Sequence, residues 1–188
     1  MALLPEVQKH YGRLKLYING SWVASESDLI YEDVNPATGE VIAEFPSATD
    51  SDIEQAIQSA QVALASWREV PLRDKARYLF DLRGKFEEHF DMLCRVLVQD
   101  HGRTIGEARG TLRRCIENIE SACSALLLLT KGECVTDLAK GLDQALYWEP
   151  RGVFLIITPN NIPMHAWSSY VPYALASGCP VVVSPSKN

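Results

Sequence analysis

Near its carboxyl end, the chain reads VFLIITPNNIP over residues 153–163, and a second apolar run, VVV, follows at 181–183. The five apolar residues at 153–157 are typical of a strand that is covered on both faces. Residues 163–176 predict a helix with proline in its first turn, and Ser177-Gly178 can end that helix. A strand, a helix and a strand within about 30 residues predict a right-handed parallel βαβ unit.

The amino-terminal part predicts a small antiparallel layer. Extended runs at 16–18 and 22–23 flank Asn19-Gly20, which is the sequence signal of a type I′ hairpin. A second pair of extended runs, at 29–34 and 41–45, flanks the turn NPATG. Proline fixes φ in that turn and glycine permits a positive φ, so the chain can reverse there.

The middle of the chain has the spacing of amphipathic helices. Thr49 with Asp52, and Thr104 with Glu107, form two capping boxes, each of which predicts the start of a helix. Between these helices, apolar residues three and four positions apart predict one continuous helix over 71–102.

Composition excludes several classes of protein. The chain has 188 residues, 47% of them hydrophobic, and a net charge of -6, which argues against a disordered chain and against nucleic acid as a partner. No run approaches the ~18 apolar residues of a membrane span, and the first ten residues lack the pattern of a secretory signal. The five cysteines are odd in number and without C-x-x-C spacing. They predict a reduced, cytoplasmic location, structural thiols and no metal site.

Several motifs resemble the amino-terminal half of the aldehyde dehydrogenase superfamily. In chain order they are NPATGE (35–40), GRT (102–104), PRGV (150–153), TPNNIP (158–163) and GCPVVVSPSK (178–187). The resemblance covers nearly the whole chain, and residues 101–133 are most similar to the methylmalonate-semialdehyde dehydrogenase branch. It implies an α/β fold: a small antiparallel layer, helices, and the first βαβ of a Rossmann-like parallel sheet.

The resemblance also implies a division of the chain. Residues 1–138 correspond to the amino-terminal strands and helices of the nucleotide-binding domain, and 151–188 to the start of the Rossmann-like core. Residues 139–150 correspond to a strand of the oligomerisation arm, within which Gln144 to Trp148 resembles the arm's first strand.

Site residues follow from the resemblance, position by position. Asn161 corresponds to the oxyanion donor, and an amide suits this task because it donates a hydrogen bond without carrying a charge. From its local sequence alone, Asn161 is instead an amide that satisfies loop backbone groups. The cofactor, NAD or NADP, is expected at two sets of positions. They are Ile157, Thr158 and Pro159 beside the nicotinamide, and Ser184, Ser186 and Lys187 beside the adenosine ribose.

The chain differs from the family's motifs at four positions. Asn160 and Ile162 replace aromatic residues, Ser184 replaces a lysine and Lys187 replaces a glutamate. An ammonium at 187 would attract a 2′-phosphate that a carboxylate repels, which predicts a preference for NADP. A solvated Lys187 without such a role is the alternative.

The implied activity is NAD(P)-dependent oxidation of an aldehyde to an acid or an acyl thioester, with water or coenzyme A as the acyl acceptor. The positions of the family's nucleophilic cysteine and general-base glutamate fall beyond residue 188, so this chain alone is expected to lack turnover. One alternative is a non-catalytic truncated paralogue that binds a longer homologue, and another is a helical interaction module without a ligand. Homo-oligomers are also expected, because an uncovered apolar strand at 181–183 favours self-association.

Overall fold

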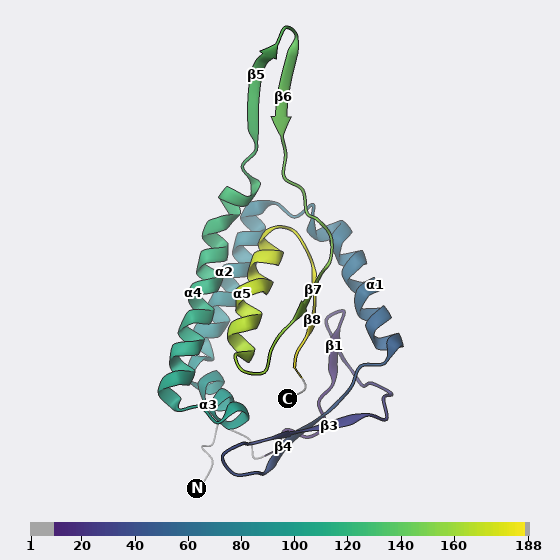
Figure 1. Cartoon of the computed structure of the whole chain (residues 1–188), viewed down its shortest axis with the longest axis vertical. Coiled ribbons are helices and arrows are strands. Elements are labelled where there is room, and N and C mark those ends of the chain that lie inside the picture. Colours follow the sequence, from purple (N-terminus) through teal and green to yellow (C-terminus); the bar gives the residue numbers. More distant parts are fainter. Residues whose placement is uncertain (1–9, 187–188) are drawn as a thin grey trace.

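The computed structural model describes residues 10–186 (Figure 1). In the amino-terminal layer, β1 (Leu16–Ile18) pairs with β2 (Ser21–Val23), and β3 (Ile30–Val34) pairs with β4 (Val41–Pro46). Both pairs are antiparallel. Asn19-Gly20 has φ of 51° and 75°, as a type I′ turn requires. The predicted antiparallel layer is confirmed, as two separate two-stranded sheets.

Both predicted capping boxes are present, and each begins a helix. Thr49 Oγ1 accepts the backbone N–H of Asp52 at 3.1 Å, at the start of α1 (Asp50–Trp67). Thr104 Oγ1 accepts the backbone N–H of Glu107 at 3.3 Å, at the start of α4 (Ile105–Thr130). In each box the acidic side chain accepts a hydrogen bond from the backbone N–H of the threonine. Two N–H groups that would otherwise lack a partner are thus bonded at the start of each helix.

The single helix predicted over 71–102 is wrong: two helices occupy this segment. α2 (Leu72–Glu88) and α3 (Phe90–His101) meet at His89, whose φ of -102° and ψ of 14° are not helical. The break contains neither glycine nor proline, so the local sequence gives no sign of it. Apolar spacing continues across the break, because Phe86 and Phe90 on either side both face the same core.

One hydrophobic core lies among α2, α3, α4 and the carboxyl-terminal helix α5 (Pro163–Ala176). In Figure 1, α5 lies beside α4, with α2 behind them. α4 contributes most of the buried side chains, which are Ala108, Leu112, Cys115, Ile116, Ile119, Ala122 and Leu126. Removal of this apolar surface from water is the main stabilising contribution to the packing of the helices.

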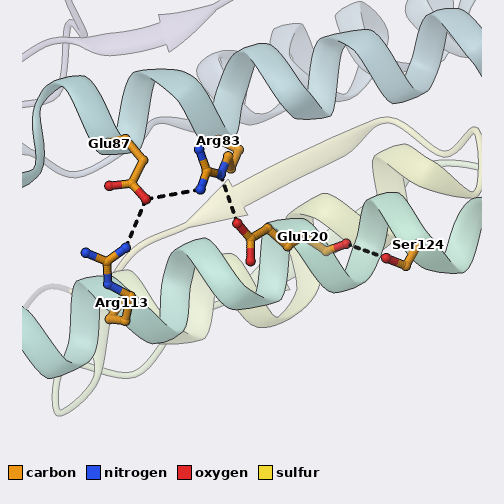
Figure 2. Close-up of polar contacts among 5 residues, drawn as sticks. All are labelled: Arg83, Glu87, Arg113, Glu120 and Ser124. Carbon is orange, nitrogen blue, oxygen red and sulfur yellow. Dashed lines mark hydrogen bonds and ion pairs between the residues drawn. The ribbon is translucent and has the colours of Figure 1, made fainter.

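A network of ion pairs joins α2 to α4 on the surface above this core (Figure 2). Arg83 contacts Glu87 at 3.3 Å and Glu120 at 2.9 Å, and Arg113 contacts Glu87 at 2.9 Å. These side chains are between 31% and 52% exposed. Each exposed pair contributes at most about 1 kcal/mol, so the network helps to align the two helices while the core holds them.

The carboxyl-terminal part is the predicted parallel βαβ unit. β7 (Phe154–Ile157) pairs in parallel with β8 (Val181–Ser184), from Phe154 opposite Val181 to Ile157 opposite Ser184, and α5 connects them. The proline at the start of α5 occupies its first turn, as expected. The fold class predicted from the sequence is therefore confirmed.

The end of α1 fixes this βαβ unit against the other helices. Trp67 Nε1–H donates to the carbonyl oxygen of Leu175 on α5 at 3.0 Å. Lys75 on α2 is buried, donates to the carbonyl oxygen of Arg68 at 3.4 Å, and lies 5.9 Å from the centre of the Trp67 ring. Burial lowers the pKa of Lys75. This cation compensates for the absence of a basic residue in the last turn of α1.

A hairpin of β5 (Glu133–Ala139) and β6 (Leu142–Leu146) projects from the body of the molecule (Figure 1). Every residue of both strands is exposed. The prediction that Gln144 begins the first strand of an arm is wrong, because Gln144 lies in the second strand and β5 precedes it. The sequence does not predict β5, because Asp137 interrupts the alternation of side chains between the two faces of the strand. Asp137 has φ of 52° and lies within a shift of the pairing register.

In the part of the chain that the structure describes, none of the helices has both the length and the apolar character needed to cross a bilayer.

Self-association is expected from the open face of β7. Leu155 and Ile157 are 64% and 72% exposed on one face of the strand, while Ile156 between them is buried. β7 and β8 form a two-stranded sheet, so each strand also has an unpaired edge within the described residues.

We expect the chain to form oligomers or aggregates, which sedimentation velocity would detect. Leu155→Lys should shift the distribution toward monomer, and Val62→Lys, at a 76% exposed position on α1, should not. A monodisperse monomer with a cooperative melt before any substitution would contradict this.

Candidate functional site

The loop of residues 158–162 lies at the carboxyl end of parallel strand β7. The backbone N–H of Thr158 donates to the carbonyl oxygen of Ser184 at 3.1 Å, which keeps the ends of β7 and β8 together. Polar residues that follow these two strands therefore lie at the same edge of the sheet. Open α/β sheets bind ligands at this edge, because the loops and helix N-termini there present free polar groups.

Asn161 lies in this loop with its side chain exposed. Its backbone carbonyl oxygen accepts a hydrogen bond from the Arg103 guanidinium and lies 3.2 Å from Nε2 of His101. Among the described residues, none hydrogen-bonds the side-chain amide of Asn161, so its N–H groups are available to a ligand. The alternative expectation is that this amide bonds backbone groups of its own loop. No such bond is present among the described residues.

The expected cofactor positions differ in accessibility. Ile157 is 72% exposed, and Pro159 and Ser184 are also exposed. Ser186 is half-buried. Thr158 is only 6% exposed and its N–H is already bonded to Ser184, so Thr158 shapes the turn more than it offers a donor. Lys187 lies outside the described residues.

The five cysteines are poorly suited to attack a carbonyl near Asn161. Cys94, Cys115 and Cys179 are buried, and burial raises the pKa of Cys94, Cys115 and the half-buried Cys123. A raised pKa keeps a thiol protonated and weakly nucleophilic. Cys179 precedes β8, at the opposite edge of the sheet from Asn161, and the exposed Cys134 lies on the projecting hairpin.

A polar cluster joins α4 to the first turns of α5. Asn118 Nδ2 donates to the hydroxyls of Ser168 and Ser169 at 3.1 and 3.3 Å, and both hydroxyls donate to the carbonyl oxygen of His165. Nδ1 of His165 is buried without a partner among the described residues. Across residues 10–186, no group of three or more His, Cys, Asp or Glu side chains is placed to hold a metal ion.

The local sequence does not reveal the contacts of His101, Arg103 and Asn118. The GRT motif predicts a turn, yet nothing in it indicates contact with a loop 58 residues later. One feature of the sequence, a basic residue on each side of Gly102, is consistent with such a contact. This arrangement is common on protein surfaces and therefore does not identify the contact.

Two carboxyl groups interact where the amino-terminal layer meets α3. Asp33 on β3 donates a hydrogen bond to Asp100, near the end of α3. Burial and the neighbouring Asp100 raise the pKa of Asp33 from 3.8 to about 6. Burial also raises the pKa of Asp100. Below about pH 6, a proton on Asp33 therefore reduces the repulsion between the two carboxyl groups.

Asp33→Asn should remove a pH dependence of stability. Between pH 3.8 and about 6 the folded chain retains a proton that the unfolded chain releases, so the free energy of unfolding falls as pH rises. The asparagine keeps a hydrogen-bonding side chain without titrating. Above this window the variant should be more stable by on the order of 1 kcal/mol, after allowance for solvent screening. Thermal melts across pH test this, with the exposed Asp28→Asn as the control; parallel pH profiles for Asp33→Asn and the unsubstituted chain would contradict it.

The chain matches the model of the aldehyde dehydrogenase family over residues 22–188. It is 39% identical over 174 residues to malonate-semialdehyde dehydrogenase 1 of Geobacillus kaustophilus (strain HTA426), an alignment that covers 93% of this chain and 36% of that protein. The chain therefore spans little more than a third of the length of this relative.

Solved structures show the same similarity. The methylmalonate-semialdehyde dehydrogenase DddC from Oceanimonas doudoroffii superposes with a TM-score of 0.89 and 36% identity, over 93% of this chain and 36% of that one. A putative methylmalonate-semialdehyde dehydrogenase from Sinorhizobium meliloti 1021, complexed with NAD, superposes with a TM-score of 0.90 and 29% identity, over 95% of this chain and 36% of that one.

Proposed function

Because the chain belongs to the aldehyde dehydrogenase family, as its match over residues 22–188 shows, we propose that it supplies the cofactor-binding and oxyanion-donating part of an NAD(P)-dependent aldehyde dehydrogenase. One observation carries this proposal: among the described residues none bonds the Asn161 amide, which lies at the carboxyl edge of a parallel βαβ unit while its backbone is held in place. A neutral donor fixed in advance can stabilise the negative charge that develops on a carbonyl oxygen under attack.

The residues at this edge fit a nicotinamide dinucleotide. Ile157 and Pro159 offer exposed apolar surface to a ring, and the hydroxyls of Ser184 and Ser186 suit ribose oxygens. When bound, the cofactor accepts the hydride that leaves the aldehyde carbon. A relative solved with NAD supports this class of cofactor.

The substrate follows from the relatives. Those with 36% to 39% identity are named for malonate or methylmalonate semialdehyde. The proposed substrate is thus a short semialdehyde that carries a carboxylate, with water or coenzyme A as the acyl acceptor.

The chain's own residues account for binding and orientation. Asn161 donates to the substrate oxygen, and the Thr158–Ser184 bond holds the two halves of the cofactor edge together. The cysteines at described positions are buried, weakly acidic or remote from this edge, so the attacking thiol has to come from elsewhere. We therefore expect nucleotide binding without turnover by this chain alone.

A second candidate function, a non-catalytic partner of a longer homologue, is favoured by the projecting hairpin. Its exposed apolar residues Val135, Leu138, Leu142 and Leu146 are between 43% and 54% exposed. Such a hairpin can pair with another chain, either a second copy or a longer relative.

Two assays on the purified chain test the proposed function. NADH or NADPH fluorescence reports binding, and formation of the reduced cofactor from malonate semialdehyde, with and without coenzyme A, reports turnover. Saturable binding without turnover, which Asn161→Ala leaves intact, is the expected result, and turnover would contradict the expectation that the attacking thiol comes from elsewhere. The absence of saturable binding would overturn the proposal.

The expected cofactor preference comes from Lys187, whose position in the family's motif implies a place beside the adenosine ribose. A cation there should favour the 2′-phosphate, so we expect NADP to bind several-fold more tightly than NAD at low ionic strength. Lys187→Glu should reverse this preference, and Lys131→Glu, at an exposed residue next to α4, should not. Isothermal titration measures both affinities. A clear preference of the unsubstituted chain for NAD would contradict the prediction.

A further inference from the structure

We propose that His101 and Arg103 are positioning residues that orient the amide of Asn161 by holding its backbone carbonyl oxygen. The inference rests on the proposed role of Asn161 as an oxyanion donor. The observation behind it is that two donors from the α3–α4 turn converge on one carbonyl oxygen of the β7–α5 loop. Both donors contact the backbone of Asn161 and leave its side-chain amide unbonded among the described residues.

Arg103 is itself held in place by α4. One of its terminal nitrogens, Nη2, donates to the Asn161 carbonyl oxygen, and the other, Nη1, donates to the hydroxyl of Thr111 at 3.3 Å. Thr111 is only 8% exposed and belongs to the helix that forms most of the core. The planar guanidinium thus connects the loop to the helix that contributes most of the core, a task that its fixed fork of donors suits.

The turn between the two donors is also supported from the other side. Gly102 has φ of 66° and its N–H donates to the carbonyl oxygen of Val98 at 2.9 Å, which ends α3. A Cβ at Gly102 would lie 2.7 Å from Cγ of Pro36, so the turn packs directly against the β3–β4 connection. Three parts of the fold meet here, and the position of the turn is determined by all three.

Holding the carbonyl restricts the backbone from which the side chain extends. The two contacts to the oxygen of residue 161 limit rotation of this peptide group, and the tetrahedral Cα then limits the direction in which Cβ leaves the backbone. An oxyanion donor has to be placed to within about 0.5 Å before the reaction, since reorganisation during the reaction would cost rate. His101 and Arg103 contribute to that placement through the backbone carbonyl oxygen of Asn161.

Amide hydrogen exchange in the chain without nucleotide tests this. Prolines at 159 and 163 lack an N–H, so a peptide across the loop reports mainly on Asn160, Asn161 and Ile162. Arg103→Met keeps the aliphatic stem and removes both bonds, and it should raise exchange in this loop by about tenfold. Arg103→Lys retains one charged donor and should restore part of the protection. Arg109→Met is the matched control, because Arg109 lies on α4, the helix to which Arg103 is bonded, and pairs with the exposed Asp91 at 3.5 Å.

The pattern across the molecule decides the outcome. Faster exchange confined to the loop, with core amides of α4 unchanged and partial rescue by lysine, supports positioning. Equal exchange in the loop of Arg103→Met and the unsubstituted chain would overturn the inference, as would an equal rise throughout the molecule, which indicates general destabilisation. These results do not depend on nucleotide binding, so the inference and the proposed function can fail separately.

Discussion

Gly102→Ala is expected to lower the free energy of unfolding by about 2 to 5 kcal/mol. The residue has φ of 66°, where a side chain costs about 1 to 2 kcal/mol. The new Cβ would also approach Cγ of Pro36 to 2.7 Å, so the turn or the β3–β4 connection has to move, at a further cost of about 1 to 3 kcal/mol. Because Gly102 separates His101 from Arg103, the displacement should also raise exchange in the loop of Asn161.

Thermal and urea unfolding measure this effect, and Gly106→Ala is the matched control. Gly106 is helical and nothing lies within 4 Å of the Cβ that alanine would add. Alanine there should stabilise the chain by about 0.5 to 1 kcal/mol, through its better helix propensity. The account of the turn would be contradicted if both substitutions had the same sign.

Leu112→Ala is expected to lower the free energy of unfolding by about 3 to 4 kcal/mol. Leu112 is 0% exposed in the core among α2, α3, α4 and α5, so its removal forfeits buried apolar surface and leaves a cavity. Since this core supports the helix that holds Arg103, the site should loosen with it. The melting temperature should fall by roughly 6 to 16 °C for a chain of this size.

The control for this substitution lies on the same helix. Leu127 is 76% exposed, and Leu127→Ala should change the free energy of unfolding by no more than about 0.5 kcal/mol. A loss at Leu127 as large as that at Leu112 would mean that the exposed end of α4 is buried in an assembly of chains. A loss below about 1 kcal/mol at Leu112 would contradict the placement of the core.

Features determined by neighbouring residues could be predicted from the sequence. The two capping boxes, the Asn19-Gly20 turn and the parallel strands around α5 depend on residues close in sequence, and all are present. The family suggested by the ordered motifs is confirmed by the match over residues 22–188.

Features that depend on tertiary contact or on unusual backbone geometry could not be predicted. His89 interrupts the predicted helix without a breaking residue, and Asp137 disturbs the alternation of β5. The bond from Arg103 to Asn161 spans 58 residues, and no local pattern encodes it. The raised pKa of Asp33 likewise depends on Asp100, which is far away in the sequence.

The site thus depends on the whole described fold. Asn161 is held by a turn between α3 and α4, that turn is packed against the amino-terminal layer, and α4 is fixed by the core. The roles proposed for Asn161, Ile157, Pro159, Ser184, Ser186 and Lys187 all require that a dinucleotide occupies the carboxyl edge of β7 and β8.

Backbone amide chemical shifts recorded during titration with NAD or NADP test this requirement most directly. The account predicts saturable shifts concentrated at Ile157, Thr158, Ser184 and Ser186, with smaller changes at Asn161. Shifts centred on the projecting hairpin or on the outer face of α4, or no saturable shift at all, would contradict it.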